Sequence, residues 1–157
     1  MHERLTRLVQ LNEARFNLAD CALVLELPQS PLLLHCNPLV IDHVVGNLLD
    51  NALHFASQRK DGGRVTIRVR LEPDHDTERP LLIEIEDNGC GVKTGMMQTL
   101  FEPRYSDKAE GTGMGLFIAQ SYTEGLGGTL GLVESVRWRC TRFVVRLPIL
   151  LNQWRKE

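Results

Sequence analysis

The spacing of apolar residues along the first third of the chain predicts a helix, two strands and a longer helix. Apolar positions in residues 3–17 recur near the helical period, so we expect a short amphipathic helix there. Two short apolar runs, residues 22–27 and 32–36, are separated by prolines, a pattern typical of strands joined by a turn. Asn37 precedes a proline, and this pair favours the start of a helix that we expect to cover residues 38–57.

The rest of the chain alternates strand patterns with a second helix pattern. Apolar and polar side chains alternate over residues 65–71, which predicts a strand with one buried face. Residues 81–86 follow a similar pattern and are its expected antiparallel partner. The other expected elements are a short helix near 94–100, a helix over 113–126, and strands near 129–135 and 139–147. Helices interspersed with antiparallel strand pairs predict a two-layer α/β sandwich of the α+β kind.

Composition fits one ordinary globular domain, which we place at residues 1–157. The hydrophobic share is 43% and the charged share 24%, and a net charge of −2 gives no electrostatic reason to expect nucleic acid as a partner. No apolar run reaches the roughly 18 residues that a membrane span needs, and no signal peptide pattern opens the chain. The four cysteines lie far apart, so we expect free thiols in a reducing cytoplasm rather than a zinc site. We therefore expect a soluble cytoplasmic domain, whether its parent protein is soluble or anchored in the inner membrane.

The predicted long helix carries two asparagines and a phenylalanine at a spacing of four. Residues four apart advance by about 400°, so Asn47, Asn51 and Phe55 stay within about 80° of arc on one face. Amide oxygens are neutral, hard ligands suited to Mg²⁺, which also binds substrate phosphates. Taken alone, however, the asparagines fit a solvent-exposed helix face at least as well.

Two glycine-rich segments could approach a ligand closely. Residues 87–91 directly follow a predicted strand, and the Asp87 carboxylate could accept a hydrogen bond from an exocyclic amine such as that of adenine. A tight turn between two strands explains the same residues equally well. Residues 111–116 open a predicted helix, where backbone N–H groups and the helix dipole favour phosphate. No Gly-Lys-Ser/Thr follows, so this segment is not a Walker P-loop.

Taken together, these segments resemble a known family. Residues 47–52, 87–91, 100–103 and 111–116 resemble, in this order, the N, G1, F and G2 boxes of sensor histidine kinases. These kinases share a superfamily with gyrase, Hsp90 and MutL ATPases. The resemblance covers about residues 38–148, and its end is similar to the family's last strand. It implies the Bergerat ATP-binding fold, in which a mixed, mostly antiparallel sheet packs on helices.

The resemblance implies roles for individual side chains. Asn51 would coordinate Mg²⁺ between the ATP phosphates, and Asn47, one turn earlier, would assist directly or through water. Asp87 would bind the adenine amine, Phe55 would pack on the adenine ring, and Thr141 would support the aspartate through its hydroxyl.

The resemblance also places an ATP lid at residues 101–112, anchored by Phe101 and extended into the glycines that follow. Lys108 would meet the phosphates as a catalytic group, although a lone lysine in a loop is often simply solvated. The remaining implied ATP contacts are Gly89, Gly91, Val92, Phe101, Ser106, Gly111, Thr112, Gly113, Met114, Gly115 and Leu116.

One position separates a kinase from an ATPase in this superfamily. The ATPase branch has a water-activating glutamate four residues before the Mg²⁺ asparagine, whereas this chain has Asn47, whose amide has no useful basicity. The resemblance therefore implies transfer of the γ-phosphoryl group to a histidine on a separate dimerisation domain, and then to the receiver domain of a response regulator. Residues 1–20 would include a connecting helix, and the isolated domain would be a monomer.

Four positions depart from the family's pattern. His54 stands where a basic residue is common, His43 where an acidic or amide residue is common, Arg104 in place of an aromatic residue and Cys140 in place of glycine. These departures bear on nucleotide affinity and lid packing. Three alternatives stay open: an ATPase of the same superfamily, a regulatory module that transfers no phosphate, and a serine-directed kinase of the anti-sigma type.

Overall fold

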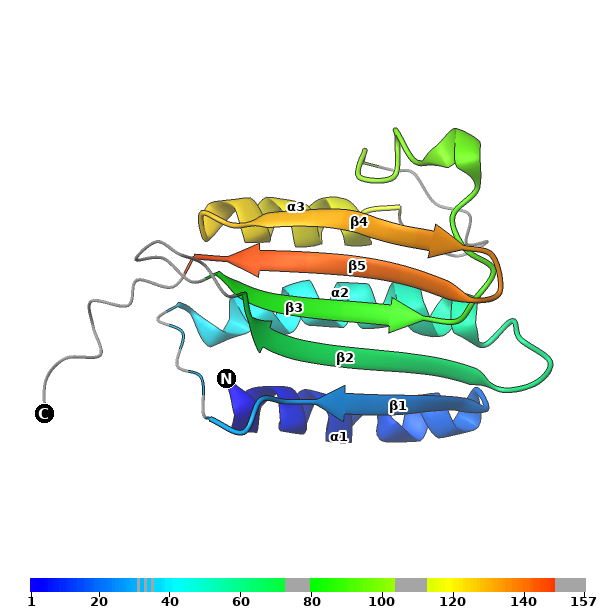
Figure 1. Ribbon diagram of the computed structural model, residues 1–157, viewed down its shortest axis with the longest axis horizontal. Coiled ribbons are helices and arrows are strands. Elements are labelled where there is room, and N and C mark those ends of the chain that lie inside the picture. The colour runs from blue at the N-terminus through cyan, green and yellow to red at the C-terminus, as the bar shows by residue number, and fades with distance from the viewer. Residues whose placement is uncertain (31, 33, 35, 73–79, 104–112, 149–157) are drawn as a thin grey trace, which may run out of the picture.

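A five-stranded sheet packs against three α-helices in the described part of the chain (Figure 1). The computed structural model describes residues 1–157 except 31, 33, 35, 73–79, 104–112 and 149–157. The helices are α1 (His2–Leu18), α2 (Pro38–Ala56) and α3 (Gly115–Gly125). The strands are β1 (Cys21–Glu26), β2 (Gly63–Leu71), β3 (Leu81–Asp87), β4 (Thr129–Val136) and β5 (Cys140–Leu147). The predicted two-layer α/β arrangement is therefore confirmed.

The sheet has the order β1-β2-β3-β5-β4 and is mixed. β1 runs parallel to β2, whereas the other neighbouring strands are antiparallel. The register places Asp87, the last residue of β3, directly opposite Thr141 at the start of β5. Two residues far apart in the chain thus meet at one end of the sheet.

Helix α2 begins where the sequence predicted. The Asn37 side chain accepts a hydrogen bond from the Leu39 N–H at 3.0 Å, and Pro38 occupies the first helical position. Its buried side chains recur at intervals of three and four and face the sheet: Ile41, Val44, Val45, Leu48, Leu49, Ala52 and Ala56. One face of α2 is thus buried in the core, which leaves its other side chains to line a site.

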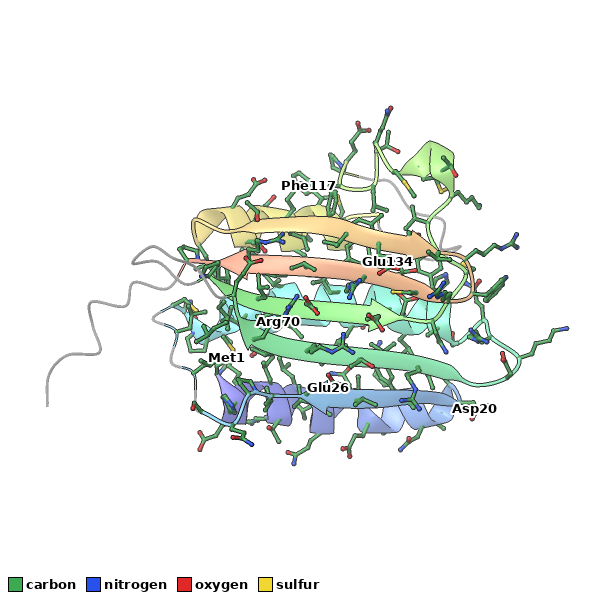
Figure 2. The ribbon with its side chains drawn as sticks, viewed as in Figure 1. Met1, Asp20, Glu26, Arg70, Phe117 and Glu134 are labelled. Atoms are coloured by element: carbon green, nitrogen blue, oxygen red, sulfur yellow. The ribbon has the colours of Figure 1, made fainter. Side chains whose placement is uncertain are left out.

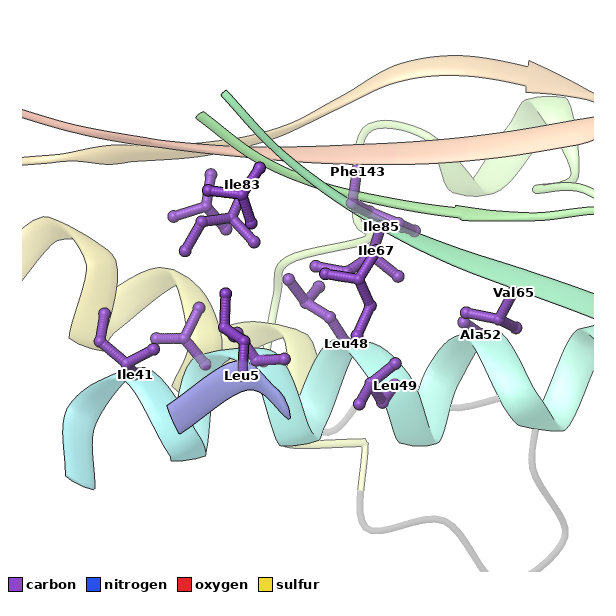
Figure 3. Packing of buried hydrophobic residues seen from close by; sticks show 14 of the residues in the cluster. Leu5, Ile41, Leu48, Leu49, Ala52, Val65, Ile67, Ile83, Ile85 and Phe143 are labelled. Carbon is purple, nitrogen blue, oxygen red and sulfur yellow. The ribbon is translucent and has the colours of Figure 1, made fainter. Parts of the chain in front are cut away.

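The core lies between α2 and the inner face of the sheet. Figure 3 shows Leu48 of α2 beside Ile67, Ile85 and Phe143, which come from three strands. Each of these side chains is at most 2% exposed. Burial of such side chains stabilises the fold by about 1.5–3 kcal/mol each. The position of α2 relative to the sheet is therefore set by close packing.

The expected strand at residues 32–36 is wrong for the residues that the structure describes there. Leu32, Leu34 and Cys36 are not in a strand. The Leu32 side chain is buried, and its N–H donates a hydrogen bond to His2 Nδ1 at 3.3 Å. Leu34 and Cys36 are partly buried against the same core. These three apolar side chains are covered without belonging to a strand, because burial requires only apolar side chains and not a strand partner. The helix expected near 94–100 is likewise only a short 3₁₀ turn, η1 (Thr94–Met96).

The outer face of the sheet is less open than the alternating pattern predicted. Leu82 and Glu84 of β3 point away from the helices, yet they are only 1% and 3% exposed. Arginine–glutamate pairs cross the strands of this face, among them Arg68 with Glu26 at 2.6 Å and Arg70 with Glu84. Figure 2 shows Glu26, Arg70 and Glu134 on this face. Cross-strand pairs of opposite charge stabilise neighbouring strands.

Among the described residues, no helix has both the length and the apolar character to cross a membrane.

Candidate nucleotide site

A cavity of about 900 Å³ lies at the end of the sheet where β3 ends and β4 turns into β5, at the right in Figure 1. Its volume falls within the range of ligand pockets, about 300–1,000 Å³. The lining residues are Asn47, Asp50, Asn51, Phe55, Gln58, Cys90, Gly91, Val92, Lys93, Thr94, Met96, Met97, Leu100, Gly113, Gly115, Leu116, Ser135, Arg137 and Trp138. They come from α2, the loop after β3, the start of α3 and the β4–β5 turn.

The α2 wall contains the three side chains that the helical period predicted to lie together: Asn47, Asn51 and Phe55. Asn47 Nδ2 donates a hydrogen bond to the His43 carbonyl at 2.8 Å, which fixes the carboxamide. A Cβ on Gly115 would lie 3.2 Å from Asn47 Oδ1, so the start of α3 approaches α2 closely here. No described residue hydrogen-bonds the Asn51 side chain, whose carboxamide can therefore bind a ligand.

Asp87 lies behind the cavity wall. Its side chain is 2% exposed, and Oδ1 accepts a hydrogen bond from the Gly89 N–H at 2.8 Å. A Cβ on Gly89 would lie 2.6 Å from the Phe55 carbonyl oxygen and 2.8 Å from Asp87 Oδ1. Only glycine fits between the carboxylate and α2. The sequence predicted Gly89 as a contact of the ligand, but Gly89 is not among the residues that line the cavity.

Burial raises the pKa of Asp87 to about 7 from its ordinary value of 3.8. The Gly89 N–H and the neighbouring Thr141 hydroxyl oppose this rise, whereas Glu86 adds to it. Thr141 is 4% exposed, and its Oγ1 makes no hydrogen bond of good geometry to a described residue. The Thr141 hydroxyl and the Asp87 carboxyl thus lie close together without a well-formed hydrogen bond between them, which leaves both groups able to bond a ligand.

The loop after β3 turns at Gly91 and rests on the β4–β5 turn. Gly91 has φ +76°, in the region that favours glycine. A Cβ there would lie 3.2 Å from both Arg137 Cα and Ser135 Oγ. The Val92 N–H donates a hydrogen bond to Ser135 Oγ at 2.8 Å. The loop and the turn therefore form one continuous wall.

The start of α3 lies beside the Asn47 end of the α2 wall. Gly113, Gly115 and Leu116 line the cavity, whereas Met114 does not. Phe101 does not line it either: its ring meets the Phe143 ring edge to face, with centroids 6.3 Å apart, and so anchors this segment to the core. The predicted contacts Ser106, Lys108, Gly111 and Thr112, and the departure Arg104, lie outside the described residues.

The other departures from the family's pattern make contacts within the protein. The His54 ring meets the Phe55 ring edge to face, with centroids 4.9 Å apart, and His43 stacks on Tyr122 at 5.5 Å. Cys140 is buried in β5 as a free thiol. In the part of the chain that the structure describes, no three histidine, cysteine or acidic side chains are grouped to hold a metal ion. The side-chain oxygens that α2 contributes to the cavity are those of Asn47, Asp50 and Asn51.

The sequence reasoning missed the β4–β5 wall of the cavity. Ser135, Arg137 and Trp138 line it, although they lie far along the chain from α2. The turn contains two arginines around a tryptophan, an unusual composition for a tight turn between strands. That composition was the one available signal, but it does not reveal which surface the turn contacts.

Comparison with known proteins finds the same family over most of the chain. Residues 36–151 match the family model described as histidine kinase-, DNA gyrase B-, and HSP90-like ATPase. Sporulation kinase E of Bacillus subtilis is 30% identical over 145 residues, which are 92% of this chain and 18% of that protein. The sensory histidine kinase/phosphatase NtrB of Klebsiella oxytoca is 36% identical over 128 residues, 78% of this chain and 35% of its own length. The chain thus corresponds to a minor part of each curated relative.

Solved structures share the fold at lower identity. The mycobacterial sensor histidine kinase MprB superposes with a TM-score of 0.78 at 22% identity, covering 94% of this chain and 95% of that one. The catalytic domain of histidine kinase ThkA superposes with a TM-score of 0.77 at 21% identity, covering 94% and 91%. At this identity the likeness shows the fold alone, and it agrees with the mixed sheet packed on helices.

Proposed function

Because this chain belongs to the histidine kinase-, DNA gyrase B- and HSP90-like ATPase family, we propose that it is the ATP-binding catalytic domain of a two-component sensor kinase. It transfers the γ-phosphoryl group of Mg·ATP to a histidine on a separate dimerisation domain, and a response regulator receives that group afterwards. The observation that carries this proposal is the stripe of Asn47, Asn51 and Phe55, which lines a cavity of about 900 Å³ together with the start of α3.

The amide groups of α2 are suited to Mg²⁺. Asn51 offers a neutral oxygen in the cavity without a hydrogen-bond partner among the described residues, and Asn47 lies one turn away. Mg²⁺ is usually held by one or two protein oxygens, together with water and substrate phosphates. These residues therefore fit a Mg·ATP site, with Asn51 as the protein ligand and Asn47 assisting. Bound Mg²⁺ would neutralise charge on the phosphates.

The groups around Asp87 are suited to the base of the nucleotide. The carboxylate can accept a hydrogen bond from the adenine amine, and the Thr141 hydroxyl can donate or accept one. Phe55 supplies an aromatic surface at the same end of the cavity. Because Asp87 is buried, its hydrogen bond with a base would form away from competing water.

The start of α3 is suited to the phosphates. Gly113 and Gly115 line the cavity there, and backbone N–H groups at a helix start attract anions. Ser106 and Lys108, outside the described residues, stay predicted phosphate contacts. Asn47 cannot act as a base toward water, so the arrangement favours transfer to a positioned histidine over hydrolysis. Such transfer depends mainly on positioning and neutralisation of charge.

Calorimetric titration with a non-hydrolysable ATP analogue, with and without Mg²⁺, tests the proposal. We expect binding that strengthens when Mg²⁺ is present. The Asn51→Ala variant should lose that strengthening while it retains binding to the base. Failure of the unmodified chain to bind at millimolar nucleotide would contradict the proposal and favour a partner-binding module.

A further inference from the structure

The β4–β5 turn, residues 137–139, is part of the cavity although none of the four sequence boxes includes it. Arg137 and Trp138 both line the cavity. The Trp138 N–H donates a hydrogen bond to the Gly89 carbonyl at 2.8 Å, two residues beyond Asp87. The turn therefore packs against the loop that follows Asp87.

Trp138 has a backbone conformation that does not suit a tryptophan. Its φ is +57°, in the left-handed region that glycine enters readily and that bulky residues rarely adopt. A large side chain at such a position is a reason to look for a function, because the surroundings must hold the strained backbone in place.

Hydrogen bonds from α2's C-terminal side hold the turn. Arg59 Nη1 donates to the Trp138 carbonyl at 2.6 Å and to the Asn88 carbonyl at 3.1 Å. Asp61 fixes the same guanidinium through two hydrogen bonds, at 3.0 and 2.6 Å. The Trp138 backbone is thus tied to the loop after β3 directly through its N–H and, by way of Arg59, through its carbonyl, which fixes the position of the turn before any ligand binds.

The side chain itself is suited to a flat ligand. Trp138 is 40% exposed, and the Arg137 guanidinium lies over its ring, 5.8 Å from the centroid. We propose that the Trp138 indole contacts the purine base and, with Arg137, forms the outer wall of the base-binding end of the cavity. This inference rests on the proposed function. An aromatic side chain stacks on any base, so Trp138 would increase affinity for the base without acting on the phosphates.

The test uses the W154F chain as its reference, so that Trp138 is the one tryptophan in it. Into this chain we would introduce W138G, which removes the indole but suits φ +57°, and W138F, which keeps an aromatic ring. Binding of ATP, ADP, adenosine and tripolyphosphate is measured by calorimetry, and stability by thermal unfolding. Fluorescence of Trp138 is followed in the reference chain during titration with ADP.

We expect W138G to weaken the binding of ATP, ADP and adenosine by a common factor of about 5 or more, which corresponds to the loss of base–aromatic stacking. Tripolyphosphate affinity should not change, and the melting temperature should hold or rise. W138F should stay within about threefold of the reference. Titration with ADP should change the fluorescence of Trp138, and the Kd obtained from that change should equal the Kd from calorimetry.

Two results would overturn the inference while leaving the proposed function intact. One is equal affinity of W138G and the reference chain for all three adenine ligands. The other is a loss of affinity that includes tripolyphosphate or that is accompanied by a lower melting temperature, which would mean that Trp138 has only a structural role. Failure of the reference chain itself to bind any nucleotide would instead contradict the proposed function.

Discussion

Asp87 is a buried carboxyl beside the candidate site, and its pKa is raised well above the ordinary value. A carboxyl that is 2% exposed is costly to ionise because burial removes the charge from water, although the Gly89 N–H and the Thr141 hydroxyl reduce that cost. Its pKa of about 7 expresses that cost. Proteins accept such costs mostly at functional sites, where a ligand supplies the missing partner.

Replacing Asp87 with asparagine should therefore weaken the binding of adenine nucleotides. Asparagine can offer the amine an oxygen but no charge, so we expect a loss of about 1.5–3 kcal/mol in binding free energy. Calorimetry with ADP measures it. Equal affinity of the Asp87→Asn variant and the unmodified chain would mean that the base binds elsewhere.

The same carboxyl should make stability depend on pH. Between pH 4 and 7 the folded chain holds the Asp87 proton more tightly than the unfolded chain, because the folded pKa is about 7 against an ordinary 3.8. Raising the pH through this window therefore lowers the free energy of unfolding, and the decline ends above pH 7. Denaturant unfolding at several pH values should show this decline in the unmodified chain and less of it in Asp87→Asn. An identical pH dependence in both chains would contradict the assignment.

Asn51 should matter for phosphoryl transfer much more than for stability. Its side chain is half-buried and makes no hydrogen bond to a described residue, so its removal should cost less than about 1 kcal/mol of stability. Asn51→Ala should nevertheless abolish Mg²⁺-dependent phosphoryl transfer, measured with radiolabelled ATP. Asn37→Ala, at the start of the same helix, is the matched control: it should lower stability by about 1 kcal/mol while it retains transfer.

At the scale of elements, the sequence predicted what depends on local period and missed what depends on distant contact. The α2 stripe could be predicted because a helix fixes the relative positions of Asn47, Asn51 and Phe55. The β4–β5 wall could not, because Trp138 reaches Gly89 through tertiary packing that no local pattern encodes. The strand expected at residues 32–36 was wrong for a related reason, because apolar side chains that are covered in an irregular segment give the same sequence pattern as those of a buried strand.

The contact between α2 and the loop after β3 can be tested with one methyl group. A Cβ on Gly89 would lie 2.6 Å from the Phe55 backbone, so Gly89→Ala should push the loop from the helix. We expect a loss of about 1–3 kcal/mol in stability and loss of nucleotide binding. Gly46→Ala, on α2 with open space around it, is the control and should be neutral or slightly stabilising. Normal nucleotide binding by Gly89→Ala would show that this close approach is not needed.

At the scale of the whole molecule, the mixed sheet brings segments from residue 47 to residue 138 to one end of the domain. One layer of helices packs on the sheet's inner face, and charged pairs cross its outer face. The chain covers 18% and 35% of two relatives. We propose that the acceptor histidine lies on a separate dimerisation domain. The chain's own part is to hold the nucleotide and position its γ-phosphoryl group.

The fate of the γ-phosphoryl group of radiolabelled ATP distinguishes phosphoryl transfer from hydrolysis. The chain is mixed with the histidine-bearing dimerisation domain of its parent kinase, and label on protein is compared with free phosphate. We predict acid-labile, base-stable label on the acceptor histidine, absent with Asn51→Ala and with little free phosphate released by the chain alone. Rapid release of free phosphate with no labelled histidine would contradict the account and identify the chain as an ATPase.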